Sequence, residues 1–101
     1  MRRIARAEFE RKQVVREWNI PWLEEMRWYE EGRALGLILL DMAQGDWNAL
    51  VFQKDEEGRY RVADMALLYR TVDEACRALA KMLAEKANDL SPISVRDPVF
   101  A

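Results

Sequence analysis

The sequence contains no histidine, and its 101 residues include one cysteine and two serines. Histidine is the commonest general base and transition-metal ligand, so its absence removes Ser–His and Cys–His nucleophile pairs. A zinc site needs several Cys or His ligands, which Cys76 alone cannot supply. The Gly-rich phosphate loop with its Gly-Lys-Ser/Thr ending is also absent. We therefore predict that the protein is not an enzyme and holds no metal or cofactor.

Long apolar runs are lacking as well. The longest, Leu35 to Leu40, is six residues long and includes a glycine, whereas a membrane span needs about 20 residues. Residues 1–17 lack the apolar segment of a signal peptide. A lone cysteine cannot form an internal disulfide, so nothing indicates an oxidising compartment. We expect a cytoplasmic protein without membrane contact.

Few glycines and prolines interrupt the chain, four and three respectively, and their positions divide it into elements. The length fits one α+β domain over residues 1–101. Residues 2–17 contain neither Gly nor Pro and predict a basic N-terminal helix over 1–18. Pro21 disfavours helical geometry at Ile20, so this helix ends before it.

Three turn signals divide residues 26–68 into four short runs, which predicts a four-stranded antiparallel meander. Gly58 suits the left-handed position of the last of these turns. The expected strands cover residues 26–31, 33–42, 47–54 and 59–68.

The second of these strands is apolar on both faces, which is typical of a central strand covered on both sides. A helix over 71–87 supplies one cover, because Thr71 and Glu74 form a capping box before an apolar stripe of helical spacing. Residues 91–101 are expected to be an extended tail. The second cover is either the thin-striped N-terminal helix or a second copy of the chain.

Charge is unevenly distributed. Residues 1–17 hold six basic and three acidic side chains, whereas residues 18–57 hold three basic and nine acidic ones. The two regions should attract each other within the fold or across a dimer. The basic helix offers candidate nucleic-acid contacts, but the acidic balance elsewhere makes such binding an unfavoured interpretation. Those candidates are Arg2, Arg3, Arg6 and Arg11.

Aromatic residues form the most distinctive cluster. Trp is enriched in cores, interfaces and ligand pockets alike, so these three interpretations stay open. Acidic neighbours around the rings would also suit a cationic ligand. The candidate residues for a partner or ligand are Trp18, Trp22, Trp28, Trp47, Glu24 and Glu25.

Three aspartates are conceivable ligands for Mg²⁺ or Ca²⁺: Asp41, Asp46 and Asp64. Aspartate is common at turns and strand ends because its carboxylate accepts nearby backbone N–H groups. The structural interpretation is therefore favoured, and no metal site is predicted.

Residues 28–83 follow a pattern of fold-bearing motifs. It reads Trp28, Leu35-Gly36-Leu37-Ile38-Leu39-Leu40-Asp41, Asp46-Trp47, Val51-Phe52, Asp55-Glu56-Glu57-Gly58-Arg59, Tyr60-Arg61 and Thr71 onward. This pattern resembles that of small uncharacterised bacterial α+β proteins, of the kind carried by mobile elements and gene cassettes. The resemblance implies the meander and the helix, and it brings no functional site.

These features favour a non-enzymatic accessory or interaction module that acts as a homodimer or through a protein partner. The expected dimer buries whichever face of the second strand the C-terminal helix leaves bare, either that of Leu35, Leu37 and Leu39 or that of Ala34, Ile38 and Leu40. The first alternative is a small-ligand binder that uses the Trp-rich acidic patch. The second is a nucleic-acid binder that uses the basic helix.

Overall fold

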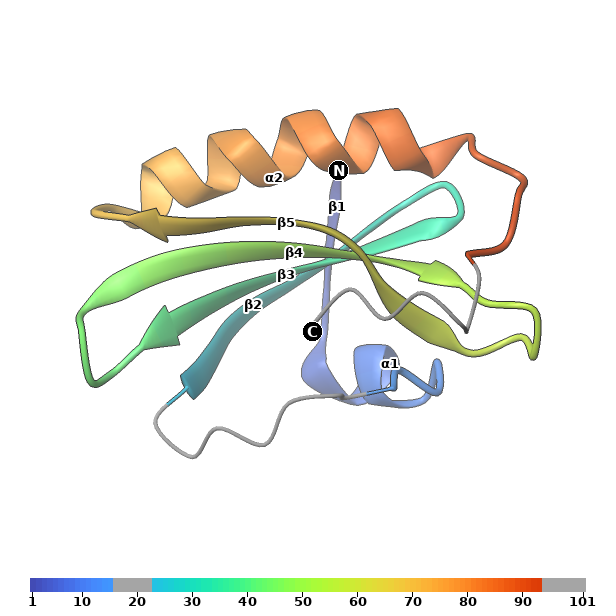
Figure 1. Cartoon of the computed structure of the whole chain (residues 1–101). Coiled ribbons are helices and arrows are strands. Elements are labelled where there is room, and N and C mark those ends of the chain that lie inside the picture. Colours follow the sequence, from blue (N-terminus) through green and yellow to red (C-terminus); the bar gives the residue numbers. More distant parts are fainter. Residues whose placement is uncertain (16–22, 94–101) are drawn as a thin grey trace.

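The computed structural model describes residues 1–15 and 23–93, with the backbone alone for residues 23–25. It is an α+β fold with a five-stranded antiparallel sheet in the order β1-β2-β3-β4-β5, so strands that follow each other in sequence pair directly. Helix α2 lies across one face and the short α1 lies against the other (Figure 1). None of the helices in the described part is long and apolar enough to cross a membrane. The elements are β1 (Arg2–Ile4), α1 (Arg6–Glu10), β2 (Leu23–Glu31), β3 (Ala34–Asp41), β4 (Asp46–Lys54), β5 (Tyr60–Tyr69) and α2 (Val72–Ala87).

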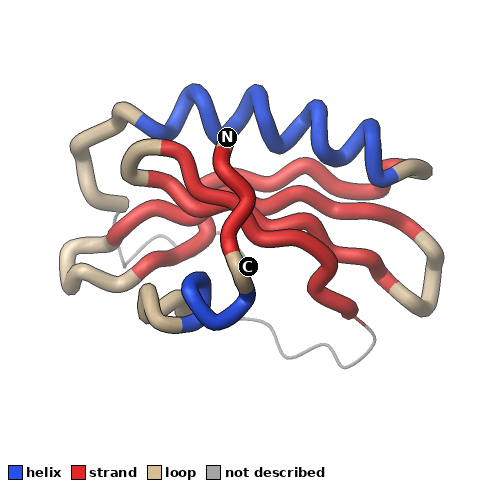
Figure 2. Tube along the Cα trace, turned by 180° about the vertical axis from the view of Figure 1, so that it is seen from behind, coloured by secondary structure: helices blue, strands red, loops and turns tan. Residues whose placement is uncertain are grey.

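The N-terminal region differs from the prediction, which placed one helix over 1–18 and four strands in the sheet. Residues Arg2–Ile4 form a fifth strand, which pairs antiparallel with β2 at an edge of the sheet and runs down the front of the view in Figure 2. Only Arg6–Glu10 are helical, and Gln13 has a φ of 56°. A short helix is marginal in water, so strand pairing with β2 overrides the weak helical preference. Residues 16–18 of the predicted helix lie outside the described residues.

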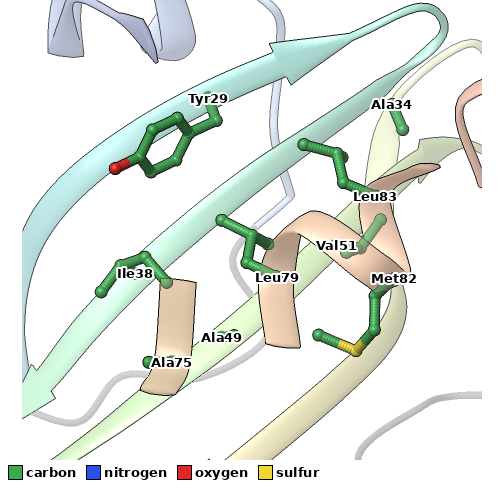
Figure 3. Packing of buried hydrophobic residues seen from close by; sticks show 9 residues of the cluster. All are labelled: Tyr29, Ala34, Ile38, Ala49, Val51, Ala75, Leu79, Met82 and Leu83. Carbon is green, nitrogen blue, oxygen red and sulfur yellow. The ribbon is translucent and has the colours of Figure 1, made fainter. Parts of the chain in front are cut away.

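The core between the sheet and α2 confirms the predicted C-terminal helix. Its buried members come from β2, β3, β4 and α2 and interlock as Figure 3 shows. A Cβ on Gly36 would lie 3.0 Å from Leu79, so the glycine lets α2 approach β3 closely. The buried residues of this cluster are Tyr29, Ala34, Ile38, Ala49, Val51, Ala75, Leu79, Met82 and Leu83.

A second core fills the face of the sheet opposite α2, for which the sequence left two possible covers, the N-terminal segment or a second copy. Leu35, Leu37 and Leu39 are 0%, 1% and 2% exposed within the single chain, so they need no second copy to cover them. Ile4 of β1 and Phe9 of α1 belong to the same buried cluster. The N-terminal segment therefore folds back over its own sheet and shields this face from water.

Both ends of α2 are anchored. At its start the Thr71 hydroxyl accepts the Glu74 N–H at 3.2 Å, as the capping box predicts. At its end the Gln53 side chain donates to the Lys86 carbonyl at 3.1 Å, and the Arg33 N–H donates to the Ala87 carbonyl at 2.9 Å. The two carbonyls are thereby satisfied by the sheet rather than by water.

Replacing Thr71 with Ala should lower the free energy of unfolding by about 0.5–2 kcal/mol, because the Glu74 N–H loses its acceptor. Urea denaturation measures the change. Thr71→Ser keeps the hydroxyl and is the matched control, with a much smaller effect. Equal stability of Thr71→Ala and the parent protein would contradict the cap.

The tail after α2 begins beside the sheet. The Ile93 N–H donates to the Lys54 carbonyl at 3.2 Å, and Ile93 forms a parallel bridge with Asp55. Residues 94–101 of the predicted tail lie outside the described residues.

Candidate functional site

The structure does not bring Trp28 and Trp47 together. Trp28 packs against the second core, on the α1 side of the sheet. Trp47 packs against the first core, on the α2 side. Trp18, Trp22 and the side chains of Glu24 and Glu25 lie outside the described residues. A patch containing both Trp28 and Trp47 is therefore ruled out by the sheet that separates them.

A cation does lie near Trp28, and it belongs to the chain itself. The guanidinium carbon of Arg6 lies 5.9 Å from the centre of the Trp28 ring, within the range of a cation–π contact. The indole Nε1 is buried and has no hydrogen-bond partner among the described residues. The site expected for a cationic ligand at the Trp28 ring is thus occupied by the Arg6 side chain.

The basic N-terminal residues are largely engaged by nearby carboxylates. Arg2 bonds Glu30 at 2.5 Å and Glu8 at 3.1 Å, and Lys12 bonds Glu30 at 2.9 Å. A hydrogen bond from Arg2 and a weaker contribution from Lys12 hold the pKa of the Glu30 carboxyl below its ordinary value. Burial of the carboxyl has the opposite, smaller effect. The attraction expected between basic and acidic regions therefore occurs inside one chain.

Arg3 and Arg11, two of the four arginines considered as nucleic-acid contacts, are exposed. Arg6 pairs with Glu10 at 2.9 Å besides its contact with Trp28. Because Arg2 and Arg6 are paired with carboxylates, they offer less charge for contacts with phosphate groups, which are the main source of nucleic-acid affinity.

Two of the three candidate aspartates, Asp41 and Asp64, have structural roles. Asp41 accepts the N–H groups of Ala43 and Gln44 and so fixes the β3–β4 turn. Asp64 lies on β5 and accepts the Met65 N–H. Within the described residues no group of three potential ligands is placed to hold a metal ion.

The two edge strands of the sheet, β1 and β5, differ in how well they are protected against pairing with another strand. The β1 edge is three residues long and carries exposed arginines, which are ordinary protections against pairing with another strand. The β5 edge spans ten residues and contains no proline or lysine. Among residues 1–15 and 23–93, the contacts that cover this edge involve its first residue: Val15 donates to the Tyr60 carbonyl at 2.8 Å and Val14 bridges to Tyr60. Beyond Tyr60, no strand of the described chain pairs with the outer side of β5.

Two consecutive leucines are exposed at the end of this edge. Leu67 and Leu68 are 50% and 67% exposed. Leu68 has a φ of 69°, an uncommon value for a leucine, and its N–H donates to the Asn48 side chain at 3.0 Å. The β4–β5 register shifts at this point, so the bulge holds the pair of leucines at the surface.

Unpaired charges flank the leucines on both sides. Asp64 precedes Leu67 by three residues and Arg70 follows it by three. Within the described part of the chain, neither side chain has an ion-pair partner. The segment from Asp64 to Arg70 therefore carries an acid at its start, a base at its end and apolar side chains between them.

Sequence reasoning placed the strand correctly but missed its role as a candidate interface. The adjacent leucines are visible in the sequence, yet only the strand order shows that they lie on an open edge. Comparisons with protein-family models, curated proteins and solved structures find no match to this chain. The function of the protein is therefore inferred from the geometry of the chain itself.

Proposed function

We propose that the protein is a non-enzymatic interaction module that forms a homodimer by antiparallel pairing of β5 with β5 of a second copy. The observation that carries the proposal is the open β5 edge, where Leu67 and Leu68 are exposed between Asp64 and Arg70. An open, apolar strand edge is a template for pairing with another strand.

A second copy suits this edge because the segment is self-complementary. Antiparallel pairing of two identical strands generates a two-fold axis, the commonest symmetry of homodimers. With the axis at Leu67, Asp64 of each copy would face Arg70 of the other, the residue directly after β5. Opposite charges at facing positions of two strands stabilise the pair, whereas like charges destabilise it.

The leucines supply the apolar part of the interface. Burying an exposed leucine contributes roughly 1.5–3 kcal/mol, and the dimer covers two from each copy. Pairing also satisfies backbone groups along the edge that otherwise bond to water. Both contributions favour a dimer that extends the sheet rather than one that stacks on its face.

Sedimentation velocity over micromolar to millimolar concentration tests the proposal. We expect the mass to rise from that of the 11.9 kDa chain to twice that value. Leu67→Lys should shift the equilibrium toward monomer, because a charged side chain would lie at the axis. Leu90→Lys is the control, since Leu90 is 70% exposed and lies outside β5. A monomer at every concentration would overturn the proposal.

A charge exchange tests the pairing register. Asp64→Arg and Arg70→Asp should each weaken dimerisation about tenfold or more, because each places like charges opposite each other. The double variant restores opposite charges and should recover most of the affinity. Recovery identifies the Asp64–Arg70 pairing. Additive losses in the double variant would exclude this register.

A further inference from the structure

A cavity of about 610 Å³ opens at the end of the sheet that is distant from Leu67 and Leu68. It lies between the β2–β3 turn, the end of β4, the start of β5 and the segment that follows α2, which are close together at one end of the molecule in Figure 1. Five charged residues line it: Lys12, Glu30, Arg33, Lys54 and Asp89.

The acidic side chains of the cavity are already engaged. Glu30 accepts from both Arg2 and Lys12, so its charge is compensated by two cations. Asp89 accepts the Ser91 N–H at 3.0 Å. Asp89 keeps its charge, but the three cations that line the cavity outnumber its two carboxylates, so the lining attracts an anion.

Arg33 and Lys54 have no carboxylate within ion-pair distance in the described part of the chain. Arg33 lies in the turn before β3 and Lys54 ends β4, and both residues line the cavity. The cavity thus carries two cations that no carboxylate of the described residues pairs with.

We propose that this cavity binds a small organic anion whose phosphate or carboxylate group bridges Arg33 and Lys54. The Arg33 guanidinium offers a planar fork of donors for an oxyanion, and the Lys54 ammonium adds a point charge. The Lys54 Nζ lies 5.7 Å from the Tyr60 ring centre, so the aromatic ring lies beside the anion position.

The volume indicates a ligand larger than a bare inorganic ion. Small-molecule sites usually measure about 300–1,000 Å³ and combine a few polar groups with apolar walls. Tyr60, Leu90 and Pro92 supply apolar surface in this cavity. The organic part of the ligand would lie against these side chains while its anionic group faces the two cations.

Titration of ¹⁵N-labelled protein at low ionic strength tests the proposal with three probes: phenyl phosphate, benzoate and inorganic phosphate. We expect saturable shifts of the Arg33, Lys54 and Tyr60 amides. Phenyl phosphate should bind more tightly than inorganic phosphate because its ring contacts Tyr60. Binding of phenyl phosphate alone identifies a phosphate site, and equal binding of benzoate identifies a general oxyanion site.

Variants separate a built site from general charge attraction. Arg33→Gln and Lys54→Gln should each lower the affinity about tenfold. Lys81→Gln is the matched control, because Lys81 is exposed on α2 and outside the cavity. Without the probes, Lys54→Gln should unfold at nearly the same urea concentration as the parent protein, because Lys54 is exposed at the end of β4. Absence of saturable shifts, or equal affinity in all three variants, would overturn the proposal.

Discussion

Replacement of Phe9 with Ala is expected to lower the free energy of unfolding by about 3–5 kcal/mol, a large part of the stability of a domain this small. Phe9 is 1% exposed, and its ring meets that of Phe52 edge-on, with ring centres 5.7 Å apart. The truncation leaves a cavity in the second core, which surrounding side chains fill only partly. Urea denaturation monitored by tryptophan fluorescence measures the loss.

Leu90→Ala is the control for this prediction. Leu90 is 70% exposed, so its truncation should change stability by less than about 0.5 kcal/mol. If Phe9→Ala had an equally small effect, the N-terminal segment would not cover the sheet. The face formed by Leu35, Leu37 and Leu39 would then again require a second copy.

The sheet and α2 could be predicted because their signals are local. Turn residues separate β2, β3, β4 and β5, and the Thr71 capping box marks the start of α2 within a few residues. The apolar character of β3 on both faces also indicated correctly that the sheet is covered on both sides.

The N-terminal region could not be predicted because its structure depends on distant residues. Ile4 pairs with Trp28 across the β1–β2 ladder, a partner that lies far along the chain. In a continuous helix Ile4, Ala7, Val14 and Trp18 would form the apolar stripe and Phe9 would lie off it, yet Phe9 is the buried residue of α1. Helical spacing is informative only where a helix is long, and α1 has five residues.

The candidate interface was only partly accessible to sequence reasoning. An interaction role was expected, but its residues were sought among the tryptophans. Trp28 and Trp47 are distant from each other because they lie on opposite faces of the sheet. Leu67 and Leu68 gain significance from the position of β5 at an edge, which depends on the order of all five strands.

Asp55 is a buried charge in the β4–β5 turn, and its carboxylate organises that turn. Its side chain has no exposed surface and accepts the Glu57 N–H at 2.8 Å, the Arg59 N–H at 2.9 Å and the Arg61 Nε–H at 2.7 Å. Backbone N–H groups that lose a buried acceptor are costly to leave unsatisfied. The carboxylate therefore links the geometry of the turn to the stability of the two strands.

Replacing Asp55 with Ala should lower the free energy of unfolding by about 3–5 kcal/mol, because the N–H groups of Glu57 and Arg59 lose their buried acceptor and the Asp55–Arg61 ion pair is removed. Glu56→Gln alters an exposed neighbour in the same turn and is the control, with a change below about 0.5 kcal/mol. Equal stability of the two variants would show that the turn forms without the Asp55 carboxylate.

The pH dependence of stability gives an independent readout of the same group. Burial raises the pKa of Asp55, but the N–H of Arg59, the Arg61 guanidinium and the N–H of Glu57 together hold it below the ordinary value of 3.8. The unfolded chain therefore binds a proton before the folded chain does as the pH falls. The stabilisation is complete well above pH 3.8 and is lost as the pH falls through that value and then through the lower folded pKa.

Urea denaturation of the parent protein and of Asp55→Asn, from pH 7 to pH 2, measures this contribution. We expect a constant difference in unfolding free energy above about pH 5, because the carboxyl is ionised in both states there. Below that pH the difference should shrink, since the parent protein loses the favourable charge while the amide side chain of the variant does not titrate. Parallel curves over the whole range would mean that the Asp55 carboxylate has the same pKa in the folded and unfolded chains, and that its three hydrogen bonds do not favour the ionised form.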